Sequence, residues 1–339
     1  MRPSISTALI LIFWLFCGTL VRQVTAQVPS DQDEEVIRVD TDLTNLLFTA
    51  SDKNNRFNTA LTKEDLKVTE DGVGQQIVVF QRETDRPLAI AFLIDVSISQ
   101  ERTLPQEKAA ARAFVETIIR SNRDRAAIIA FTGSAFLEQG LTRDVFSLYR
   151  ALERVEVAMP TYLGSGRAIS GIASGPGMKA PPREGTTAIW EAIALAAGEI
   201  LGPAQDQRRR AIILLTDGHD TSSRLVQSQA IDRALAAETV IYAIGIGDRK
   251  YEGVNRDAVR AVAEGTGGRA FFPKREDDLK IAFAEIEQEL RSQYLIAYSP
   301  TNKNHDGAYR QMRIEIINPT LQKEKLKLRY RPGYFGKRR

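Results

Sequence analysis

Hydrophobic and polar residues follow two different patterns along this chain of 339 residues. Between Leu88 and Gln293, short apolar runs alternate with amphipathic segments of helical period. The flanks instead hold short runs rich in β-branched and aromatic residues, and several of these alternate between apolar and polar positions. A continuous apolar run is typical of a strand buried on both faces, and alternation is typical of a strand with one wet face. The centre therefore predicts an α/β fold and the flanks predict β structure.

The central pattern predicts six strands and six helices in one domain. The expected strands are residues 88–95, 126–131, 135–137, 211–215, 240–244 and 269–272. The expected helices are residues 105–120, 143–155, 187–201, 226–237, 256–264 and 277–291. Strands that alternate with helices indicate a mostly parallel sheet covered on both faces. We therefore expect an α/β fold with a doubly wound, mostly parallel six-stranded sheet.

The two flanks are each too short to form a convincing domain. The first has β-rich runs at residues 36–39, 46–49, 66–69 and 77–80, and the second at residues 294–298, 312–316 and 326–330. Together they predict a small seven-stranded, β-sandwich-like domain with the α/β domain inserted between its halves. Two independent appendages are the alternative. The expected boundaries are 36–85 for the first half, 86–292 for the α/β domain and 293–339 for the second half.

The first 26 residues have the pattern of a targeting signal rather than of a folded segment. Arg2 gives a positive start, Ala8 to Phe16 form an apolar run, and Val24-Thr25-Ala26 place small residues before Gln27. This combination predicts a secretory signal peptide at residues 1–26, followed by a polar linker at 27–35. We therefore expect an exported protein, periplasmic or extracellular, with no membrane span in the mature chain.

The apolar stretch at residues 7–21 leaves two alternatives to a cleaved signal. An uncleaved anchor is one, but the stretch has 15 residues, fewer than the roughly 20 that a spanning helix needs. A lipid anchor at Cys17 is the other, but Phe16 precedes it where lipoprotein signals carry a small residue. Cys17 is the only cysteine, so a mature chain without it can form no disulfide. An exported chain without disulfides favours a bacterial source.

The charge balance gives no reason to expect a nucleic-acid partner. The chain has 46 Lys and Arg against 43 Asp and Glu, and loss of the signal removes only Arg2 and Arg22. The basic runs at 208–210 and 337–339 are interpreted as solvated ends of elements. The segment 159–184, rich in glycine and proline, is too long for an ordinary connection. It is either a functional loop or merely a mobile one.

The residues with the clearest chemistry are Asp95, Ser97 and Ser99, directly after the first central strand. In an extended chain, side chains two residues apart point to the same side. A second acid, Asp217, follows the strand 211–215. If the strand order reverses between these two strands, they are neighbours about 4.8 Å apart, and their carboxyl ends border the binding crevice. We therefore expect Asp95 and Asp217 to face one site.

A threonine at the start of the helix 187–201 is the last member of this set. The sequence there is Gly185-Thr186-Thr187-Ala188-Ile189-Trp190, and a threonine hydroxyl at this place is either a helix cap or a metal ligand. Carboxylates, hydroxyls and water form an oxygen-only set, which suits Mg²⁺, Mn²⁺ or Ca²⁺. Hydroxyls carry no formal charge, so the bound cation can still attract an incoming carboxylate.

In type and order, Asp95, Ser97, Ser99, Thr187 and Asp217 resemble the metal-ion-dependent adhesion site of von Willebrand factor type A domains. Residues 125–131 and 242–247 are also similar to that family, and the resemblance covers roughly residues 86–293. The flanks resemble those of bacterial von Willebrand factor A related proteins. The family pattern implies that Ser97, Ser99 and Thr187 contact the ion directly, and that Asp95 and Asp217 act partly through water. The loop before Thr187 is longer than in most members.

The resemblance implies an exported, metal-dependent protein-binding module for adhesion or scaffolding. Such a module captures an Asp or Glu of a protein partner through its ion, and it is not an enzyme. One alternative is a structural subunit whose metal site is not used, in which the aspartates only cap strand ends. Another is a metal-dependent phosphohydrolase, for which the sequence offers no base beyond Asp220 and His219. Gly245 and Gly247 resemble part of a glycine-rich dinucleotide-binding loop, but Lys250 occupies the position where that loop requires its third glycine.

Overall fold

The computed structural model describes residues 43–83, 86–120, 122–158, 186–202, 208–248 and 253–338, and the backbone alone of residues 167–168. The expected signal peptide, the linker, the strand at 36–39 and almost all of the loop 159–184 lie outside these residues. None of the described helices combines the length and the apolar composition that a membrane span requires.

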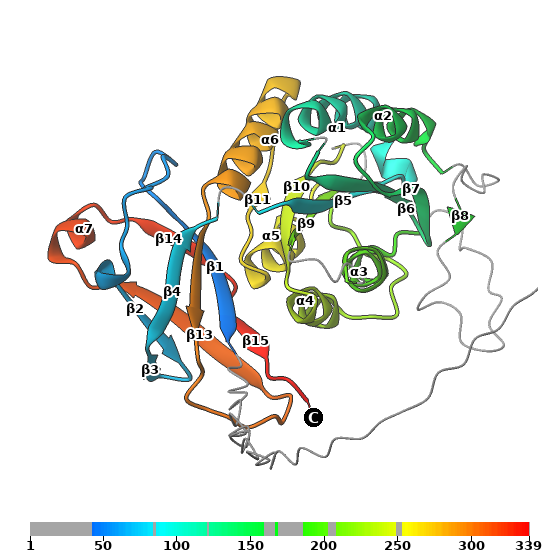
Figure 1. Cartoon of the computed structure of the whole chain (residues 1–339). Helices are drawn as coiled ribbons and strands as arrows, with labels where there is room; N and C mark the ends of the chain where they lie inside the picture. Colours follow the sequence, from blue (N-terminus) through cyan, green and yellow to red (C-terminus); the bar gives the residue numbers. More distant parts are fainter. Residues whose placement is uncertain are drawn as a thin grey trace, which may run out of the picture. The chain divides into compact units, whose positions relative to one another are not determined.

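A twisted sheet with helices on both faces forms the core of the central part of the chain (Figure 1). In spatial order its strands are β11, β10, β9, β5, β6, β7 and β8. Their bounds are β5 Leu88–Asp95, β6 Arg125–Phe131, β7 Ala135–Thr142, β8 Arg167–Ala168, β9 Arg209–Thr216, β10 Thr239–Gly245 and β11 Ala270–Phe271. All run in the same direction except β7, which is antiparallel to both of its neighbours, β6 and β8. The predicted six-stranded, mostly parallel sheet is confirmed, and the two-residue strand β8 extends its edge.

Six helices cover this sheet, close to the predicted positions. Their bounds are α1 Leu104–Ile118, α2 Val145–Arg154, α3 Ile189–Leu195, α4 Gln227–Ala236, α5 Arg256–Gly265 and α6 Glu276–Arg291. The helix predicted at 187–201 begins at Ile189 and continues beyond α3 as a π-helix, Ala196–Leu201. Helices α1, α2 and α6 pack on one face of the sheet, and α3, α4 and α5 pack on the other.

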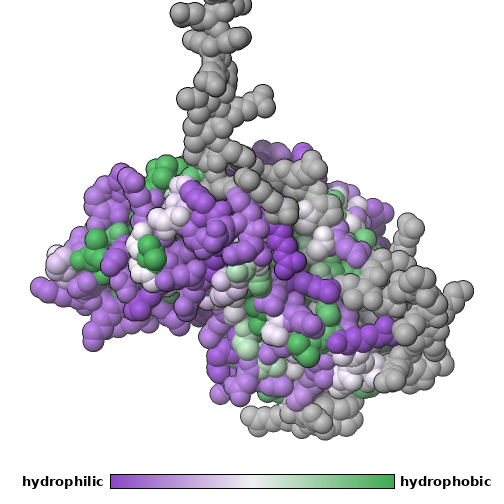
Figure 2. All heavy atoms as spheres, turned by 90° about the horizontal axis from the view of Figure 1, so that it is seen from below, coloured by the Kyte–Doolittle hydropathy of each residue, from purple (hydrophilic) through white to green (hydrophobic). Residues whose placement is uncertain are grey.

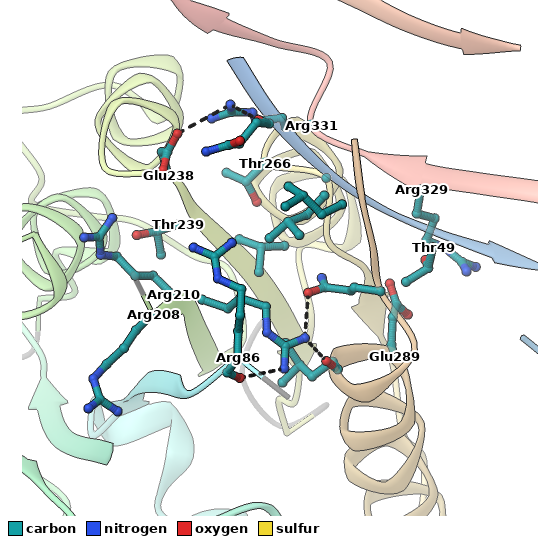
Figure 3. A pocket seen from close by; sticks show the side chains of 18 of the residues that line it. Thr49, Arg86, Arg208, Arg210, Glu238, Thr239, Thr266, Glu289, Arg329 and Arg331 are labelled. Atoms are coloured by element: carbon teal, nitrogen blue, oxygen red, sulfur yellow. Dashed lines mark hydrogen bonds and ion pairs between the residues drawn. The ribbon is translucent and has the colours of Figure 1, made fainter. Parts of the chain in front are cut away.

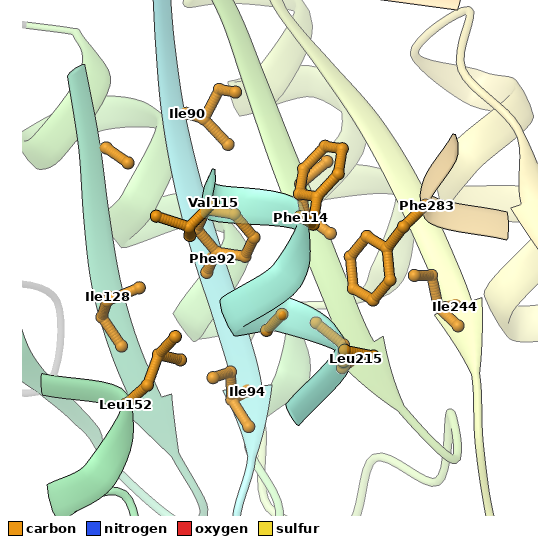
Figure 4. Packing of buried hydrophobic residues seen from close by; sticks show 14 of the residues in the cluster. Ile90, Phe92, Ile94, Phe114, Val115, Ile128, Leu152, Leu215, Ile244 and Phe283 are labelled. Carbon is orange, nitrogen blue, oxygen red and sulfur yellow. The ribbon is translucent and has the colours of Figure 1, made fainter. Parts of the chain in front are cut away.

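The central strand β5 is buried along its whole length because helices cover both of its faces. Ile90, Phe92 and Ile94 point to the face of α1 and α6, while the residues between them point to the other face. Phe114 of α1 links β5 to α6, with ring centroids 5.8 Å from Phe92 and 4.8 Å from Phe283 (Figure 4). The apolar run of β5 is therefore continuous because its alternate residues pack into two separate hydrophobic layers.

The two flanks form two four-stranded sheets packed face to face. The strand orders are β14-β1-β12-β4 and β15-β13-β2-β3. The bounds are β1 Thr44–Ser51, β2 Leu66–Glu70, β3 Val73–Gln75, β4 Ile77–Arg82, β12 Tyr294–Tyr298, β13 Tyr309–Ile316, β14 Lys327–Tyr330 and β15 Gly333–Phe335, with the short helix α7 at Pro319–Lys323. Each sheet contains strands from both flanks, and one shared hydrophobic core lies between them.

This strand pairing is what the predicted inserted arrangement requires, although the exact domain boundaries remain a prediction. The sequence missed β3, β15 and α7, which have only three to five residues each. β3 forms a hairpin with β2 across Asp71 and Gly72, both of which have positive φ. Segments this short carry too few residues to show a period of their own.

The basic run 208–210 at the start of β9 was wrongly predicted to be solvated, because Arg209 is buried. Arg208 and Arg210 on either side of it are half-buried. On the face shown in Figure 2, the described residues are mainly hydrophilic, and the apolar ones form small separate patches. That face offers no broad apolar area for docking.

Phe92 gives the most direct test of the described core. Phe92→Ala is expected to lower the free energy of unfolding by about 3–5 kcal/mol, because it leaves a cavity between β5 and α1. Urea unfolding monitored by circular dichroism measures the change. The control is Phe146→Ala on α2, where the side chain is 76% exposed and the expected change is within about 0.5 kcal/mol. Equal effects of the two substitutions would contradict this packing.

Candidate metal centre

The first part of the site is a tight turn after β5. The strand ends at Asp95, and the chain then forms a 3₁₀ turn at Ile98–Gln100 with Ser97 as its N-cap. The backbone N–H of Ser97 donates to Asp95 Oδ1 at 3.0 Å, and the hydroxyls of Ser97 and Ser99 lie 3.0 Å apart. The three side chains converge and Ser97 itself is extended, but the extended backbone expected as far as Ser99 is wrong because Ile98 begins the 3₁₀ turn. The turn brings the hydroxyls together instead.

The second part of the site is the loop after β9, which lies beside the first. β5 and β9 are hydrogen-bonded parallel neighbours, with Ile94 opposite Leu215. The hydroxyl of Ser99 donates to Asp217 Oδ2 at 2.6 Å, and the hydroxyl of Thr216 donates to Asp95 Oδ2 at 2.7 Å. Two hydrogen bonds therefore cross from one strand end to the other, in opposite directions. The expectation that Asp95 and Asp217 face one site agrees with this geometry.

Gly218 fixes the direction in which the chain leaves Asp217. Its φ is +82°, and a Cβ at this position would lie 2.7 Å from Val259 Cγ2 and 2.9 Å from the carbonyl oxygen of Asn255. The backbone N–H of Asn255 in turn donates to the carbonyl of Asp217 at 2.7 Å. A side chain at position 218 would therefore displace Asp217 as well as strain the turn.

Thr187 lies between the loops that follow β6 and β9. Its backbone N–H donates to the hydroxyl of Thr221 at 2.8 Å, and its carbonyl accepts from the N–H of Thr221 at 2.9 Å. On the other side, the N–H of Ala188 donates to the carbonyl of Thr132 at 2.8 Å. Thr187 is itself buried. These bonds anchor its backbone beside the ends of the central strands.

The hydroxyl of Thr187 is not the cap of α3. Ala188 occupies the N-cap position, and no side chain of that residue closes the helix. The first amides of α3 instead donate to the loop after β9: Ile189 N–H to Asp220 Oδ1 at 2.8 Å and Trp190 N–H to Ser223 Oγ at 3.1 Å. Of the two uses considered from the sequence, the capping role thus belongs to Asp220 and Ser223.

Thr216, Thr221, Asp220 and Ser223 are the site residues that sequence analysis did not assign to these tasks. A signal was present, because short polar side chains after a strand tend to bind nearby backbone N–H groups. What the sequence could not show is that the amides served by Asp220 and Ser223 belong to a helix more than thirty residues earlier in the chain.

Burial disfavours the charged forms of the carboxyl groups at and near this site. Asp95 has no exposed surface and Asp217 is 4% exposed. Burial, followed by repulsion from Asp217, raises the pKa of Asp95 to about 7, against the hydrogen bonds from Ser97 and Thr216 that lower it. Glu107 on α1 is also buried, and burial raises its pKa to about 8, with smaller contributions from Asp95 and Asp217. A cation among these carboxylates would remove the repulsion that the protein otherwise carries.

The chemistry of the donors fits a hard divalent cation. The described residues contain no group of three or more His, Cys, Asp or Glu side chains that could hold a metal, so hydroxyls have to complete the set around Asp95 and Asp217. The hydroxyls of Ser97, Ser99 and Thr187 are neutral oxygens, which suit Mg²⁺, Mn²⁺ or Ca²⁺ more than a soft metal. The backbone N–H of His219 donates to Asp217 Oδ1 at 3.0 Å.

Two models of the von Willebrand factor type A domain match the chain, one at residues 90–219 and the other at residues 177–285. Both matched ranges include Thr187 and Asp217, and the first also includes Asp95, Ser97 and Ser99. Among curated proteins, no sequence matches the chain.

Solved structures show more distant likenesses. Proximal thread matrix protein 1 from the mussel byssus is 18% identical, with a TM-score of 0.48, over 66% of this chain and 51% of that chain. BatB from Bacteroides thetaiotaomicron is 21% identical, with a TM-score of 0.44, over 61% and 100%. A von Willebrand factor type A protein from Catenulispora acidiphila is 15% identical, with a TM-score of 0.48, over 81% and 69%. The chain thus spans about half the length of the mussel protein.

The raised pKa of Asp95 predicts how stability changes with pH when metal is chelated. Between about pH 4 and pH 7, the folded protein keeps a proton on Asp95 that the unfolded chain has lost. The free energy of unfolding is therefore expected to fall as pH rises through this range, and Asp95→Asn should reduce the fall because an amide carries no charge.

Urea unfolding in EDTA, at intervals from pH 5 to pH 8, measures this dependence. Asp257→Asn is the control, because the Asp257 side chain is 96% exposed on α5, and it should follow the unmodified protein. An unchanged pH dependence in Asp95→Asn would show that Asp95 is not the residue that titrates.

Proposed function

Since the chain carries a von Willebrand factor type A domain, we propose that this domain is a divalent-metal-dependent protein-binding module. In this proposal Asp95, Ser97, Ser99, Thr187 and Asp217 hold the cation, and the cation binds an Asp or Glu side chain of a partner protein. The cation is Mg²⁺, or else Mn²⁺ or Ca²⁺. We further propose that the protein is exported and acts in adhesion or as a scaffold.

One observation carries the proposal: the 2.6 Å hydrogen bond from the Ser99 hydroxyl to Asp217 Oδ2. It joins residues 118 positions apart in sequence and puts a carboxylate and two hydroxyls from two loops in mutual contact. The same atoms can turn their oxygens to one cation, because a serine hydroxyl rotates freely to present a lone pair.

The proposed ligands also explain how a partner would be attracted. Asp95 and Asp217 together carry two negative charges, and the serine and threonine hydroxyls add none. A doubly charged cation is therefore neutralised at most by two buried groups, one of which has its pKa raised to about 7. An incoming carboxylate both completes the coordination and gains from this charge.

Support for binding rather than hydrolysis comes from the roles of the nearby acids. Asp220, the acid considered as a base for hydrolysis, accepts hydrogen bonds from Ile189 N–H, from the Ser223 hydroxyl at 2.5 Å and from the Ser223 N–H at 3.3 Å. These bonds engage both of its carboxylate oxygens, Oδ1 at the start of α3 and Oδ2 within its own loop. We therefore propose no catalytic residue, and we expect no turnover of p-nitrophenyl phosphate beyond that of Asp95→Ala.

Metal binding is tested first, by thermal unfolding of the purified protein in EDTA and then in Mg²⁺, Mn²⁺ or Ca²⁺. A ligand that binds only the folded state raises its stability, by about 2.7 kcal/mol at 100 times the dissociation constant. We expect a metal-dependent rise that is lost in Asp95→Ala and in Ser99→Ala.

The matched control is again Asp257→Asn, which removes an exposed carboxylate that pairs with Arg260 and is not a proposed ligand, and it should keep the full rise. If millimolar metal leaves the unfolding temperature of every variant unchanged, the proposal fails and a metal-independent structural subunit is the better interpretation.

Capture of an acidic side chain is tested by selection from a random peptide library on the immobilised protein in Mn²⁺. Retained peptides are expected to contain a required Asp or Glu, to be released by EDTA, and to lose binding when that residue becomes Asn or Gln. Peptides that bind equally well in EDTA, or after the acid is replaced, would contradict the proposed mode of recognition even if the protein binds metal.

A further inference from the structure

A cavity of about 90 Å³ lies at the end of the central sheet opposite to Asp95 and Asp217. Its walls include the first residues of β9 and β10. Asp217, in contrast, follows the last residue of β9. The other walls include β1, β12 and β14 of the β-sandwich, the last turn of α6, and the C-terminal ends of α4 and α5. Figure 3 shows these walls around the cavity. The space would hold about three water molecules.

The sandwich sheet turns one face to this cavity and the other to its own core. Along β1, Leu46 and Phe48 belong to the sandwich core, whereas Leu47 and Thr49 line the cavity. Thr49 lies directly opposite Arg329 of β14 in the strand pairing, so the two side chains stand on the same face of the sheet. The sheet therefore contributes a hydroxyl and a guanidinium side by side.

The lining of the cavity carries an excess of positive charge. It includes six arginines and only two glutamates. The arginines are Arg86, Arg208, Arg209, Arg210, Arg329 and Arg331, and the glutamates are Glu238 and Glu289. Glu238 already pairs with Arg331 at 3.6 Å. Arg86 pairs with Glu83 at 3.5 Å, just outside the lining. Positive charge still exceeds negative charge after these two pairs.

Arg209 is the most deeply buried of these cations, with 3% of its surface exposed. Its Nη1 donates to the carbonyl of Leu290 and to Gln293 Oε1 at 3.2 Å, and its Nη2 donates to the carbonyl of Arg86 at 3.1 Å. All three acceptors are neutral. Burial lowers the pKa of Arg209 to about 10, so the guanidinium stays charged at neutral pH. The carboxylates of Glu83 and Asp124 act on Arg209 through charge alone, so none of these hydrogen bonds to the buried guanidinium comes with a negative charge.

Polar atoms on the other walls are also left without hydrogen bonds. Among the described residues that line the cavity, Thr49 Oγ1, Arg209 Nε and Glu289 Oε2 are buried and have no partner. Figure 3 shows Thr49, Arg329 and Glu289 near one another on one wall. Burial raises the pKa of Glu289 above its ordinary range, which reduces the negative charge that it sets against the arginines. Each buried atom without a partner costs folding free energy.

We propose that this cavity is a binding site for a small oxyanion, a carboxylate or phosphate group, held by Arg209, Arg329 and the hydroxyl of Thr49. An oxyanion supplies a negative charge that bonds directly to Arg209, and it accepts hydrogen bonds from a guanidinium at two points. Leu47, Val240 and Leu295 on the same walls accommodate a short hydrocarbon part. The site is separate from the proposed metal centre and does not depend on it.

Isothermal titration of the purified protein in EDTA, at constant ionic strength, tests the proposal. The probes are inorganic phosphate and propionate, with chloride as the reference anion. We expect saturable binding of phosphate or propionate and none of chloride. The stronger of the two shows whether the site prefers a phosphate or a carboxylate. Asp95→Ala should bind the same anion equally well, which separates this site from the metal centre.

Two variants locate the bound anion. Arg329→Gln is expected to weaken binding by at least about tenfold, because it removes a charge-assisted hydrogen bond. Arg313→Gln is its control, because Arg313 lies on β13 with its side chain 71% exposed, and it should bind as the unmodified protein does. Thr49→Val keeps the shape of the side chain but removes its hydroxyl. It should raise the unfolding temperature of the anion-free protein and weaken anion binding.

Either of two results would overturn the proposal. One is the absence of saturable binding of both phosphate and propionate at millimolar concentration. The other is an equal loss of binding in Arg329→Gln and Arg313→Gln, because this would reflect the total charge of the protein rather than the cavity. Neither result would bear on the metal centre.

Discussion

The parallel pairing of β5 with β9 determines where both candidate sites of this protein lie. In parallel neighbours, the carboxyl ends meet at one edge of the sheet and the amino ends at the other. Asp95 and Asp217 therefore come together after the last paired residues, Ile94 and Leu215, while Arg209 stands opposite Leu88 at the other end. Helices on both faces bury this pair of strands throughout, so the charged groups can come only at the two ends.

Both ends of this strand pair hold buried charge that the protein compensates incompletely. At the carboxyl end, burial and repulsion raise the pKa of Asp95 to about 7, and at the amino end, burial lowers that of Arg209 to about 10. Each shift means that the charged form is disfavoured in the fold. Such groups reduce stability unless a ligand of opposite charge is bound. A cation at one end and an anion at the other are the ligands that would relieve these costs.

The β-sandwich is tied to this arrangement by the path of the chain. The chain leaves one sandwich sheet at Arg82 to enter β5, and it returns from α6 to the same sheet at Tyr294. The outer face of that sheet and the end of α6 form walls of the arginine-rich cavity, and Arg331 of the sandwich pairs with Glu238 after α4. The two halves of the sandwich cannot form one core unless the central domain brings its two ends close together.

The sequence by itself determined the fold class and predicted the candidate metal ligands. Periods of two and of 3.6 residues gave the six strands and six helices of the centre, and the types and order of Asp95, Ser97, Ser99, Thr187 and Asp217 suggested an oxygen-only metal site. Only the tertiary structure decided which atoms meet: that a 3₁₀ turn, not an extended strand, joins Ser97 to Ser99, that Asp220 rather than Thr187 holds the start of α3, and that Arg209 is buried. The physical reason is the separation in sequence between the groups that interact. Periodicity and turn chemistry act between neighbours in sequence, whereas burial, charge compensation and these hydrogen bonds depend on segments tens to hundreds of residues apart.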